Sequence, residues 1–111
     1  MQKAGIRLIL LPFLVAATGF SIAAAGEPAP PRQAELLYLL HQDCGACHGM
    51  RLKGGLGPAL EPRQLDHLTQ EQVASTILHG RPGTPMPPWR PFLTQEEALW
   101  LAAQLKRGVT R

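Results

Sequence analysis

Two thiols and an imidazole stand together in the segment Cys44-Gly45-Ala46-Cys47-His48. The two-residue gap lets both thiols reach one edge of a planar macrocycle, and the histidine that follows can supply a nitrogen ligand to its iron. This pattern indicates covalent haem attachment, in which each thiol adds to one vinyl group to form a thioether. The sequence therefore predicts one haem c, attached through Cys44 and Cys47, with His48 as the proximal iron ligand.

Closely spaced cysteines also occur in disulfides, thioredoxin-like redox sites and zinc sites. A zinc site needs two more ligands, and His67 and His79 are too far apart to form the usual short histidine pair. A thioredoxin-like site lies between a strand and a helix, and no alternating strand pattern surrounds Cys44. Each of these alternatives leaves something unexplained, so haem attachment is favoured.

An electron-carrying haem usually has a second axial ligand. His41 and Met50 are too close to the motif to reach the opposite face of the ring. Met86 lies in the segment 81–91, where five of eleven residues are proline. A loop that is already stiff loses less entropy when a weakly binding thioether ligates iron, although a proline-rich connector could also use its methionine to fill a core gap. We predict Met86 as the distal ligand, with His79 as the main rival.

A proximal histidine normally donates its second ring N–H to a fixed acceptor. The carbonyl of Pro58 is the candidate acceptor for His48. Arg81, Trp89 and Arg90 are candidates for contacts with the haem propionates, but solvated arginines and a core tryptophan explain them equally well. The residues expected to line the haem pocket are Leu52, Leu56, Leu60, Ile77 and Phe92.

Three helices are expected to position these groups. The first covers residues 33–43, is rich in leucine, and delivers Cys44 at its end. A loop follows over residues 49–58, because four glycines and a proline in this segment exclude a long regular element.

Two capping-box patterns mark the other helices. Thr69 and Gln72 open one, and Thr94 and Glu97 open the next, each placing a hydroxyl and a carboxyl or amide three residues apart. The residues expected to end these two helices are Gly80 and Gly108. Since no convincing strand appears, the sequence predicts an all-α fold.

The N-terminal segment resembles a secretory signal peptide. Lys3 and Arg7 precede an uncharged apolar run that ends in three alanines, at Ala25. We expect a signal peptide over 1–25, a flexible proline-rich lead-in over 26–31 and one small domain over 32–111. An uncleaved membrane anchor is the alternative, since the run is nearly long enough to span a bilayer.

Charge gives little evidence for a nucleic-acid partner. The whole chain carries 11 basic and 8 acidic residues, and removal of residues 1–25 takes two of the basic ones. A nearly neutral domain predicts no nucleic-acid binding and only modest electrostatic steering. After signal cleavage no membrane contact is expected, and a domain this small would gain much of its stability from the haem.

Several features together resemble the class I c-type cytochromes over the whole mature chain. They are the haem motif, Gly57-Pro58, the Met86 loop and the Trp100-Leu101 pair in the last expected helix. The resemblance implies a class I cytochrome c fold, with three main helices and loops wrapped around one covalent haem. It also implies that the first and last helices cross beside the haem.

One departure from that family concerns this crossing. The family often has a glycine eight residues and an aromatic residue four residues before the first cysteine, where this chain has Leu36 and Leu40. We expect the crossing to be looser or shifted in register, with Ala34 and Tyr38 in those roles.

Two longer segments, DCGACHGMRLKGGLGPAL and ILHGRPGTPMPPW, are similar to the small periplasmic cytochromes encoded beside the dissimilatory haem-containing nitrite reductase. The resemblance implies a periplasmic electron carrier in denitrification and not an enzyme. Its implied partners are that reductase, an upstream electron donor and the cytochrome c maturation machinery. A peroxidase-like or ligand-binding haem protein remains an alternative, as does an assembly factor for the reductase.

Overall fold

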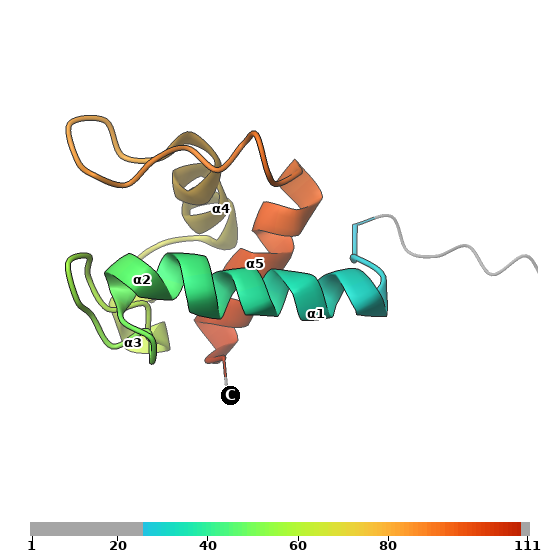
Figure 1. Ribbon diagram of the computed structural model, residues 1–111, viewed down its shortest axis with the longest axis horizontal. Coiled ribbons are helices and arrows are strands. Elements are labelled where there is room, and N and C mark those ends of the chain that lie inside the picture. The colour runs from blue at the N-terminus through green and yellow to red at the C-terminus, as the bar shows by residue number, and fades with distance from the viewer. Residues whose placement is uncertain (1–25, 110–111) are drawn as a thin grey trace, which may run out of the picture.

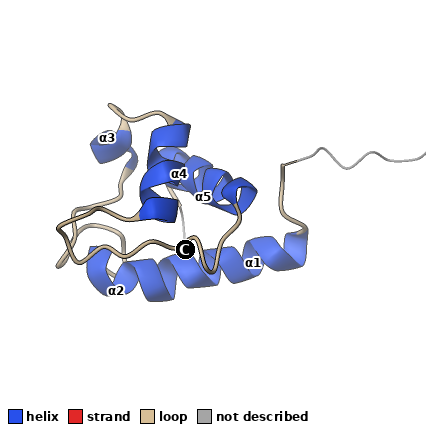
Figure 2. Ribbon diagram, turned by 90° about the horizontal axis from the view of Figure 1, so that it is seen from above, coloured by secondary structure: helices blue, strands red, loops and turns tan. Residues whose placement is uncertain are grey.

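Helices form all the regular structure in residues 26–109, the part of the chain that the computed structural model describes (Figure 1). The elements are α1 (Pro30–Leu39), η1 (Leu40–Cys44), α2 (Gly45–His48), α3 (Pro62–Leu65), α4 (Gln70–His79) and α5 (Gln95–Arg107). No strand occurs among these residues (Figure 2), so the all-α prediction is confirmed for this region. The predicted signal peptide lies outside the described residues.

The first three elements form one continuous helical rod that ends at the haem motif (Figure 1). The rod begins at Pro30, earlier than expected, because proline is well tolerated in the first helical turn, where its missing N–H costs nothing. Its middle is a π-helical turn, η1, in which the Gly45 N–H bonds to the Leu40 carbonyl. The rod ends at Gly49, whose φ of 88° is a conformation that favours glycine.

The predicted roles of Ala34 and Tyr38 in the helix crossing are wrong. Helix α1 packs against α5, but Ala34 is exposed and Tyr38 is 69% exposed. Leu36 and Leu40 are instead buried, with exposed fractions of 0% and 1%. Because these leucines are four residues apart, they share one helix face, while Tyr38 points away from it.

Helices α4 and α5 confirm both predicted capping boxes. Thr69 accepts from the Gln72 N–H and Thr94 from the Glu97 N–H, and the reciprocal side-chain bonds are also present. The two helices pack together beside the rod (Figure 2). Their buried side chains join those of α1 in one core, formed mainly by Leu36, Leu40, Val73, Ile77, Leu78, Leu93, Trp100, Leu101 and Leu105.

No helix in residues 26–109 is long and apolar enough to cross a membrane.

Helix α3 is a short element that the sequence did not predict. Lys106, near the end of α5, donates hydrogen bonds from Nζ to the carbonyls of Leu65 (2.9 Å) and Leu68 (2.6 Å). Leu65 is the last residue of α3, and its carbonyl also accepts from the Leu68 N–H (3.0 Å), while Leu68 lies three residues beyond the helix. The lysine therefore fastens α3 to α5.

Replacement of this lysine should loosen that attachment. We expect Lys106→Met to lower the free energy of unfolding by about 1–2 kcal/mol, because two carbonyls lose a charged donor while the apolar stem is kept. Urea unfolding of the haem-loaded protein measures the change. Arg107→Met is the matched control, since Arg107 is an exposed neighbour at the same helix end. An equal loss in both variants would contradict the attachment.

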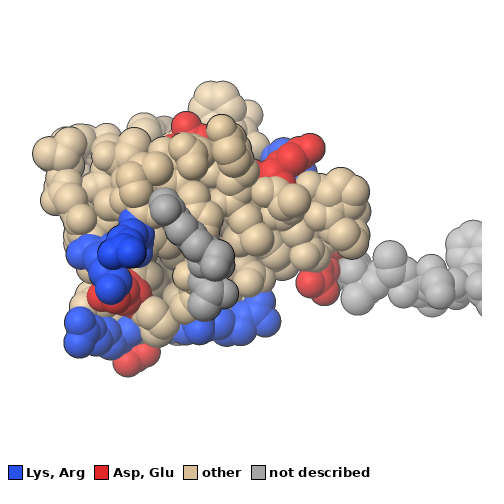
Figure 3. All heavy atoms as spheres, turned by 60° about the horizontal axis from the view of Figure 1, so that its bottom comes forward, with Lys and Arg blue, Asp and Glu red and all other residues tan. Residues whose placement is uncertain are grey.

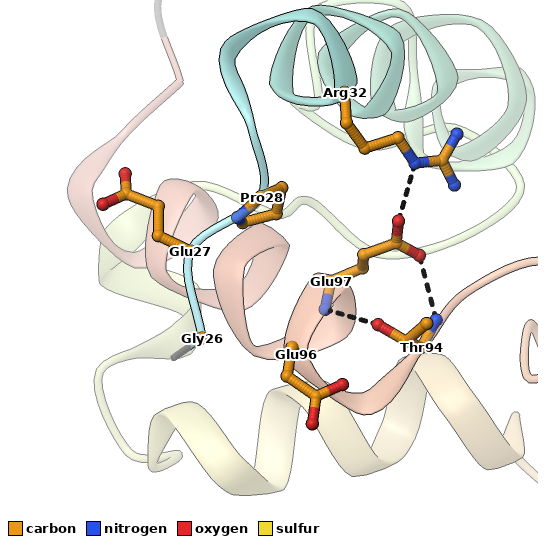
Figure 4. A pocket seen from close by; sticks show the side chains of 7 residues that line it. All are labelled: Gly26, Glu27, Pro28, Arg32, Thr94, Glu96 and Glu97. Carbon is orange, nitrogen blue, oxygen red and sulfur yellow. Dashed lines mark hydrogen bonds and ion pairs between the residues drawn. The ribbon is translucent and has the colours of Figure 1, made fainter. Parts of the chain in front are cut away.

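An ion pair joins the N-terminal end of α1 to that of α5. Arg32 donates from Nε to Oε1 of Glu97 (2.6 Å), and Oε2 of the same carboxylate accepts from the Thr94 N–H (2.9 Å). Both contacts border a surface pocket of about 240 Å³ (Figure 4). The hydrogen bond from Arg32 lowers the pKa of Glu97. Hydrogen bonds to the carboxylates of Glu97 and Glu35 raise the pKa of Arg32.

This pair should make stability depend on pH in the acid range. A carboxyl whose pKa is lowered by folding stabilises the fold above its unfolded pKa of about 4.3, and this stabilisation is lost as pH falls through the lower folded value. We therefore expect Glu97→Gln to lower the urea midpoint at pH 7 and to differ less from the wild type at pH 3. Glu96→Gln, at an exposed neighbouring position, should leave the pH profile unchanged. A constant gap between Glu97→Gln and wild type at all pH values would contradict this account.

Candidate haem-binding site

The two cysteines are free thiols at the end of the helical rod. Cys44 closes η1 and is half-buried, whereas Cys47 lies on α2 and is exposed. Burial, with a smaller contribution from Asp43, raises the pKa of the Cys44 thiol to about 11. A thiol held protonated at neutral pH does not suit a thioredoxin-like nucleophile. Within residues 26–109 no group of three or more His, Cys, Asp or Glu side chains could hold a metal ion.

His48 is held in one orientation by the backbone that follows it. Its side chain is buried, and Nδ1 lies 2.7 Å from the carbonyl oxygen of Pro58. Since a carbonyl only accepts, Nδ1 carries the proton and Nε2 keeps its lone pair. The structure thus brings together His48 and Pro58, the acceptor named from the sequence, and leaves Nε2 as the nitrogen that can ligate a metal.

Gly57 makes room for this ring. A Cβ added at Gly57 would lie 2.9 Å from both Nδ1 and Cε1 of His48, closer than real Cβ contacts come. From the sequence, Gly57 is notable only as part of a family pattern, with no role toward the histidine. The signal that could have found it is its place directly before the predicted acceptor.

The loop over residues 49–58 folds back onto the motif. The Gly54 N–H donates to the His48 carbonyl and the Gly57 N–H to the Cys47 carbonyl, both at 2.8 Å. A Cβ at Gly55 would lie 2.8 Å from the same Cys47 carbonyl. The glycine-rich composition therefore allows the loop to lie directly against the helix turn that carries Cys47 and His48.

Met86 lies in a loop that closes on itself. The Arg81 N–H donates to the Met86 carbonyl (3.2 Å), and the Thr84 hydroxyl donates to the Arg81 carbonyl (2.7 Å) and accepts from the Met86 N–H (3.3 Å). The Met86 side chain is half-buried. In both ribbon views this loop lies at the end of the molecule that carries α2 (Figures 1 and 2).

The loop is also anchored to the end of α4. The N–H groups of Trp89 and Arg90 donate to the carbonyls of Ile77 (3.0 Å) and Leu78 (3.2 Å), which are among the last four of that helix. These bonds satisfy carbonyls that the helix end leaves without partners. Met86 is therefore positioned by backbone hydrogen bonds on both sides as well as by its prolines.

His79, the rival distal ligand, is engaged elsewhere. It is exposed on α4, with Nδ1 3.0 Å from the Ser75 carbonyl and Nε2 3.4 Å from Nη1 of Arg90. Both ring nitrogens thus have a neighbour within hydrogen-bond distance, Ser75 on α4 and Arg90 in the chain that follows it. This placement favours Met86 over His79 as the distal ligand.

The other residues predicted to contact the haem range from buried to fully exposed. Arg81 is exposed, and Trp89 is half-buried against the core, with its ring centroid 5.9 Å from that of Phe92. Of the expected pocket residues, Leu52 and Ile77 are buried and Leu60 is partly buried against the core. Leu56 and Phe92 are exposed, by 95% and 66%.

Gly80 provides a test of the anchoring. Its φ is 68°, and an added Cβ would lie 2.7 Å from the Met86 carbonyl oxygen and 2.8 Å from the Pro88 nitrogen. We expect Gly80→Ala to destabilise the haem-loaded protein by about 2 kcal/mol more than Gly83→Ala, because only the former adds a backbone clash to the strained φ. Gly83 is the matched control, with a φ of 77° and nothing within 4 Å of an added Cβ. Equal thermal midpoints would contradict the anchoring.

These residues fit a covalently attached haem. Two free thiols three residues apart on one helical segment are followed directly by a histidine whose Nε2 is available, and an anchored methionine loop lies at the same end of the molecule. The thioethers would form at Cys44 and Cys47, and the iron would take its proximal nitrogen from His48.

Known proteins support this interpretation. Residues 30–105 match the family model described as cytochrome C oxidase, cbb3-type, subunit III. The chain is 53% identical to cytochrome c55X of Pseudomonas aeruginosa over 82 residues, which is 74% of this chain and 69% of that protein. It is 46% identical to cytochrome c55X of Paracoccus denitrificans over 104 residues, covering 94% of this chain and 97% of that protein.

Solved structures agree with the fold. The c-type cytochrome NirC superposes with a TM-score of 0.71 at 53% identity, over 73% of this chain and 95% of that one. Dihydro-heme d1 dehydrogenase NirN, in complex with DHE, superposes with a TM-score of 0.61 at 40% identity. That match covers 68% of this chain but only 16% of the enzyme, so the likeness is to a small part of it.

Proposed function

Because the chain belongs to the c-type cytochromes, and among them to the family of cytochrome c55X, we propose that it carries single electrons in the periplasm to a dissimilatory haem-containing nitrite reductase. It is a monohaem cytochrome with covalently bound haem c, and not an enzyme. The bound haem supplies an iron that changes oxidation state by one electron.

The protein's own residues hold and tune that group. Cys44 and Cys47 would attach it, and His48 would supply the proximal nitrogen. The Pro58 carbonyl accepts a hydrogen bond from Nδ1 of His48 and so fixes the tautomer and orientation of the ring. Met86 supplies the distal sulfur, and a thioether ligand favours the reduced iron and raises the reduction potential.

The anchoring of the Met86 loop to α4 is the observation that carries the proposal. A carrier needs both axial positions filled, whereas a peroxidase-like or ligand-binding protein needs an open position with acid and base groups beside it. A loop fastened by backbone bonds supports the closed arrangement. Rapid carbon monoxide binding to the reduced protein would contradict it, and slow or negligible binding is the expected result.

Electron transfer to the reductase tests the partner directly. We expect the reduced cytochrome, mixed with purified haem-containing nitrite reductase in a stopped-flow instrument, to be oxidised in a second-order reaction. Its rate should be fast enough to sustain nitrite turnover. An unreactive pair would contradict the donor role. Periplasmic export is tested by the mass of the mature protein, which should lack residues 1–25.

A second candidate role is in maturing the specialised haem of the reductase. The similarity to part of dihydro-heme d1 dehydrogenase favours it, at 42% identity over 82% of this chain and 17% of that enzyme. A deletion strain separates the two roles. Normal haem content in the reductase with slow turnover supports the donor, and missing haem supports maturation.

A further inference from the structure

Twelve of the sixteen charged side chains in residues 26–109 fall into two groups of opposite net charge, and the other four, two acidic and two basic, are Asp43, Glu71, Arg81 and Arg90. Five basic residues lie on the loop after His48, on α3 and at the end of α5, accompanied by two carboxylates, Glu61 and Asp66. We call this the basic face. In Figure 3, which looks toward the underside of Figure 1, blue side chains gather toward one side of the molecule with a few red ones between them. The members of the basic face are Arg51, Lys53, Arg63, Lys106 and Arg107.

The opposite end is acidic. The N-terminal ends of α1 and α5, with the segment before α1, carry four carboxylates and one guanidinium, that of Arg32. Because residues 26–109 contain as many acidic as basic residues, the domain has a charge asymmetry without a large net charge. Such a field orients a molecule as it approaches a charged partner. The carboxylates of this end belong to Glu27, Glu35, Glu96 and Glu97.

Hydrogen bonds connect the parts of the basic face to the haem site. Arg51 and Lys53 lie in the loop that bonds to the carbonyls of Cys47 and His48. The Leu60 N–H donates to the Leu52 carbonyl (2.9 Å), which joins this loop to the chain entering α3. Lys106 then joins α3 to α5. These bonds hold together the three segments that carry the basic face, and the first of them is bonded to the haem motif.

A single apolar side chain projects from this loop. Leu56 is 95% exposed, the largest exposed fraction among the large hydrophobic side chains of the described residues. It stands between two glycines, in a turn closed by a bond from the Gly55 N–H to the Gly57 carbonyl (3.0 Å) and fixed to Cys47 by the Gly57 N–H. Because the turn is bonded to the Cys47 carbonyl, the backbone at Leu56 has a defined position relative to the haem motif.

We propose that Leu56 and the basic face form the docking surface for a redox partner protein that presents carboxylates around a small apolar pocket. This inference rests on the proposed electron-carrier function and names the part of the surface through which it acts. Charge complementarity brings the partner to the face, and the seating of Leu56 places the partner beside Cys47. In electron-transfer complexes such a contact need only be small, since these interfaces are the weak and transient ones.

The composition of the face favours a protein over an anionic membrane. Glu61 and Asp66 interrupt the basic side chains, and carboxylates there repel anionic lipid headgroups but can pair with basic residues of a protein. An amphipathic helix binds a membrane through a continuous apolar face, whereas here one leucine projects from a loop.

Binding to purified haem-containing nitrite reductase tests the charges. We expect Arg51→Gln/Lys53→Gln to raise the Kd about tenfold at low ionic strength and to flatten its salt dependence. The control, Glu27→Gln/Glu96→Gln, removes two negative charges from the acidic end and so changes the net charge by the same amount in the opposite direction. It should leave the Kd within about twofold of the wild-type value. Equal and opposite effects of the two variants would show that net charge alone acts, and would overturn the docking face.

Leu56→Asn tests the apolar contact, with Leu56→Met as the conservative variant. We expect Leu56→Asn to raise the Kd about tenfold, Leu56→Met to restore most of the affinity, and the reduction potential and absorption spectrum to remain those of the wild type. A shifted potential with an unchanged Kd would show that Leu56 covers the haem, which would overturn its role in docking.

The two proposals fail in different ways. A wild-type protein that binds the reductase through this face without transferring electrons contradicts the carrier function and leaves the docking surface standing. Electron transfer with no loss of affinity in either Leu56→Asn or Arg51→Gln/Lys53→Gln contradicts the docking surface. Binding to phosphatidylglycerol vesicles that depends on Arg51 and Lys53, with no binding to the reductase, would assign the face to a membrane and overturn the inference.

Discussion

Met86→Ala should abolish the sulfur-to-iron charge-transfer absorption of the oxidised protein and lower its reduction potential by on the order of 0.1 V. The loop around Met86 is closed by hydrogen bonds at Arg81 and Thr84 and fastened to α4. Because these bonds do not involve the Met86 side chain, the variant should lose the sulfur ligand and keep the conformation of the loop. Far-ultraviolet circular dichroism should change little, which separates loss of ligation from loss of fold.

Two variants serve as controls for this prediction. Met50→Ala removes the other methionine of residues 26–109, which is 44% exposed and lies beside Gly45 of the motif helix. His79→Ala removes the rival ligand, which contacts Ser75 and Arg90. Both should keep the native absorption and potential. If either one abolishes the charge-transfer absorption and Met86→Ala does not, the assignment of the distal ligand is wrong.

Gly57→Ala should displace the proximal histidine. The added methyl group would lie 2.9 Å from the His48 ring, so that either the ring or the loop must move, and the contact between Nδ1 and Pro58 would be stretched. We expect a loss of about 3 kcal/mol in the unfolding free energy of the haem-loaded protein. A lower reduction potential should accompany it, because the histidine loses its fixed acceptor.

Gly45→Ala is the matched control for Gly57→Ala. Gly45 lies within the Cys-x-x-Cys-His motif that the Gly57 loop contacts. A Cβ added at Gly45 would lie 3.4 Å from Met50, which is close to an ordinary contact. Alanine also forms helices better than glycine. The control should therefore be as stable as the wild type or slightly more so. Equal stability of Gly57→Ala and Gly45→Ala would show that the ring has space and would contradict the positioning role of Gly57.

The sequence predicted the features that depend on short-range chemistry. Both capping boxes are visible as Thr-x-x-Gln and Thr-x-x-Glu, because a cap joins residues three positions apart. The bond between His48 and Pro58 was also anticipated, since the chemistry of a proximal histidine demands an acceptor and a glycine-rich loop can return to provide one.

The rest depends on packing that a local pattern does not encode. Tyr38 and Leu40 are both suitable core residues, and only the rotation of α1 against α5 decides that Leu40 is buried. Helix α3 is four residues long and is held by Lys106, which lies 38 or more positions further along the chain. The need for a glycine at Gly57 follows from the position of the His48 ring, which only the fold determines.

The absorption spectrum of the purified haem-loaded protein in both redox states distinguishes a closed electron carrier from a haem with an open position, because it reports haem attachment, spin state and axial ligation together. We expect a covalently bound, low-spin haem in both states, with a sulfur-to-iron charge-transfer absorption in the oxidised state that disappears in Met86→Ala. A high-spin spectrum, or a native charge-transfer absorption in Met86→Ala, would contradict this expectation.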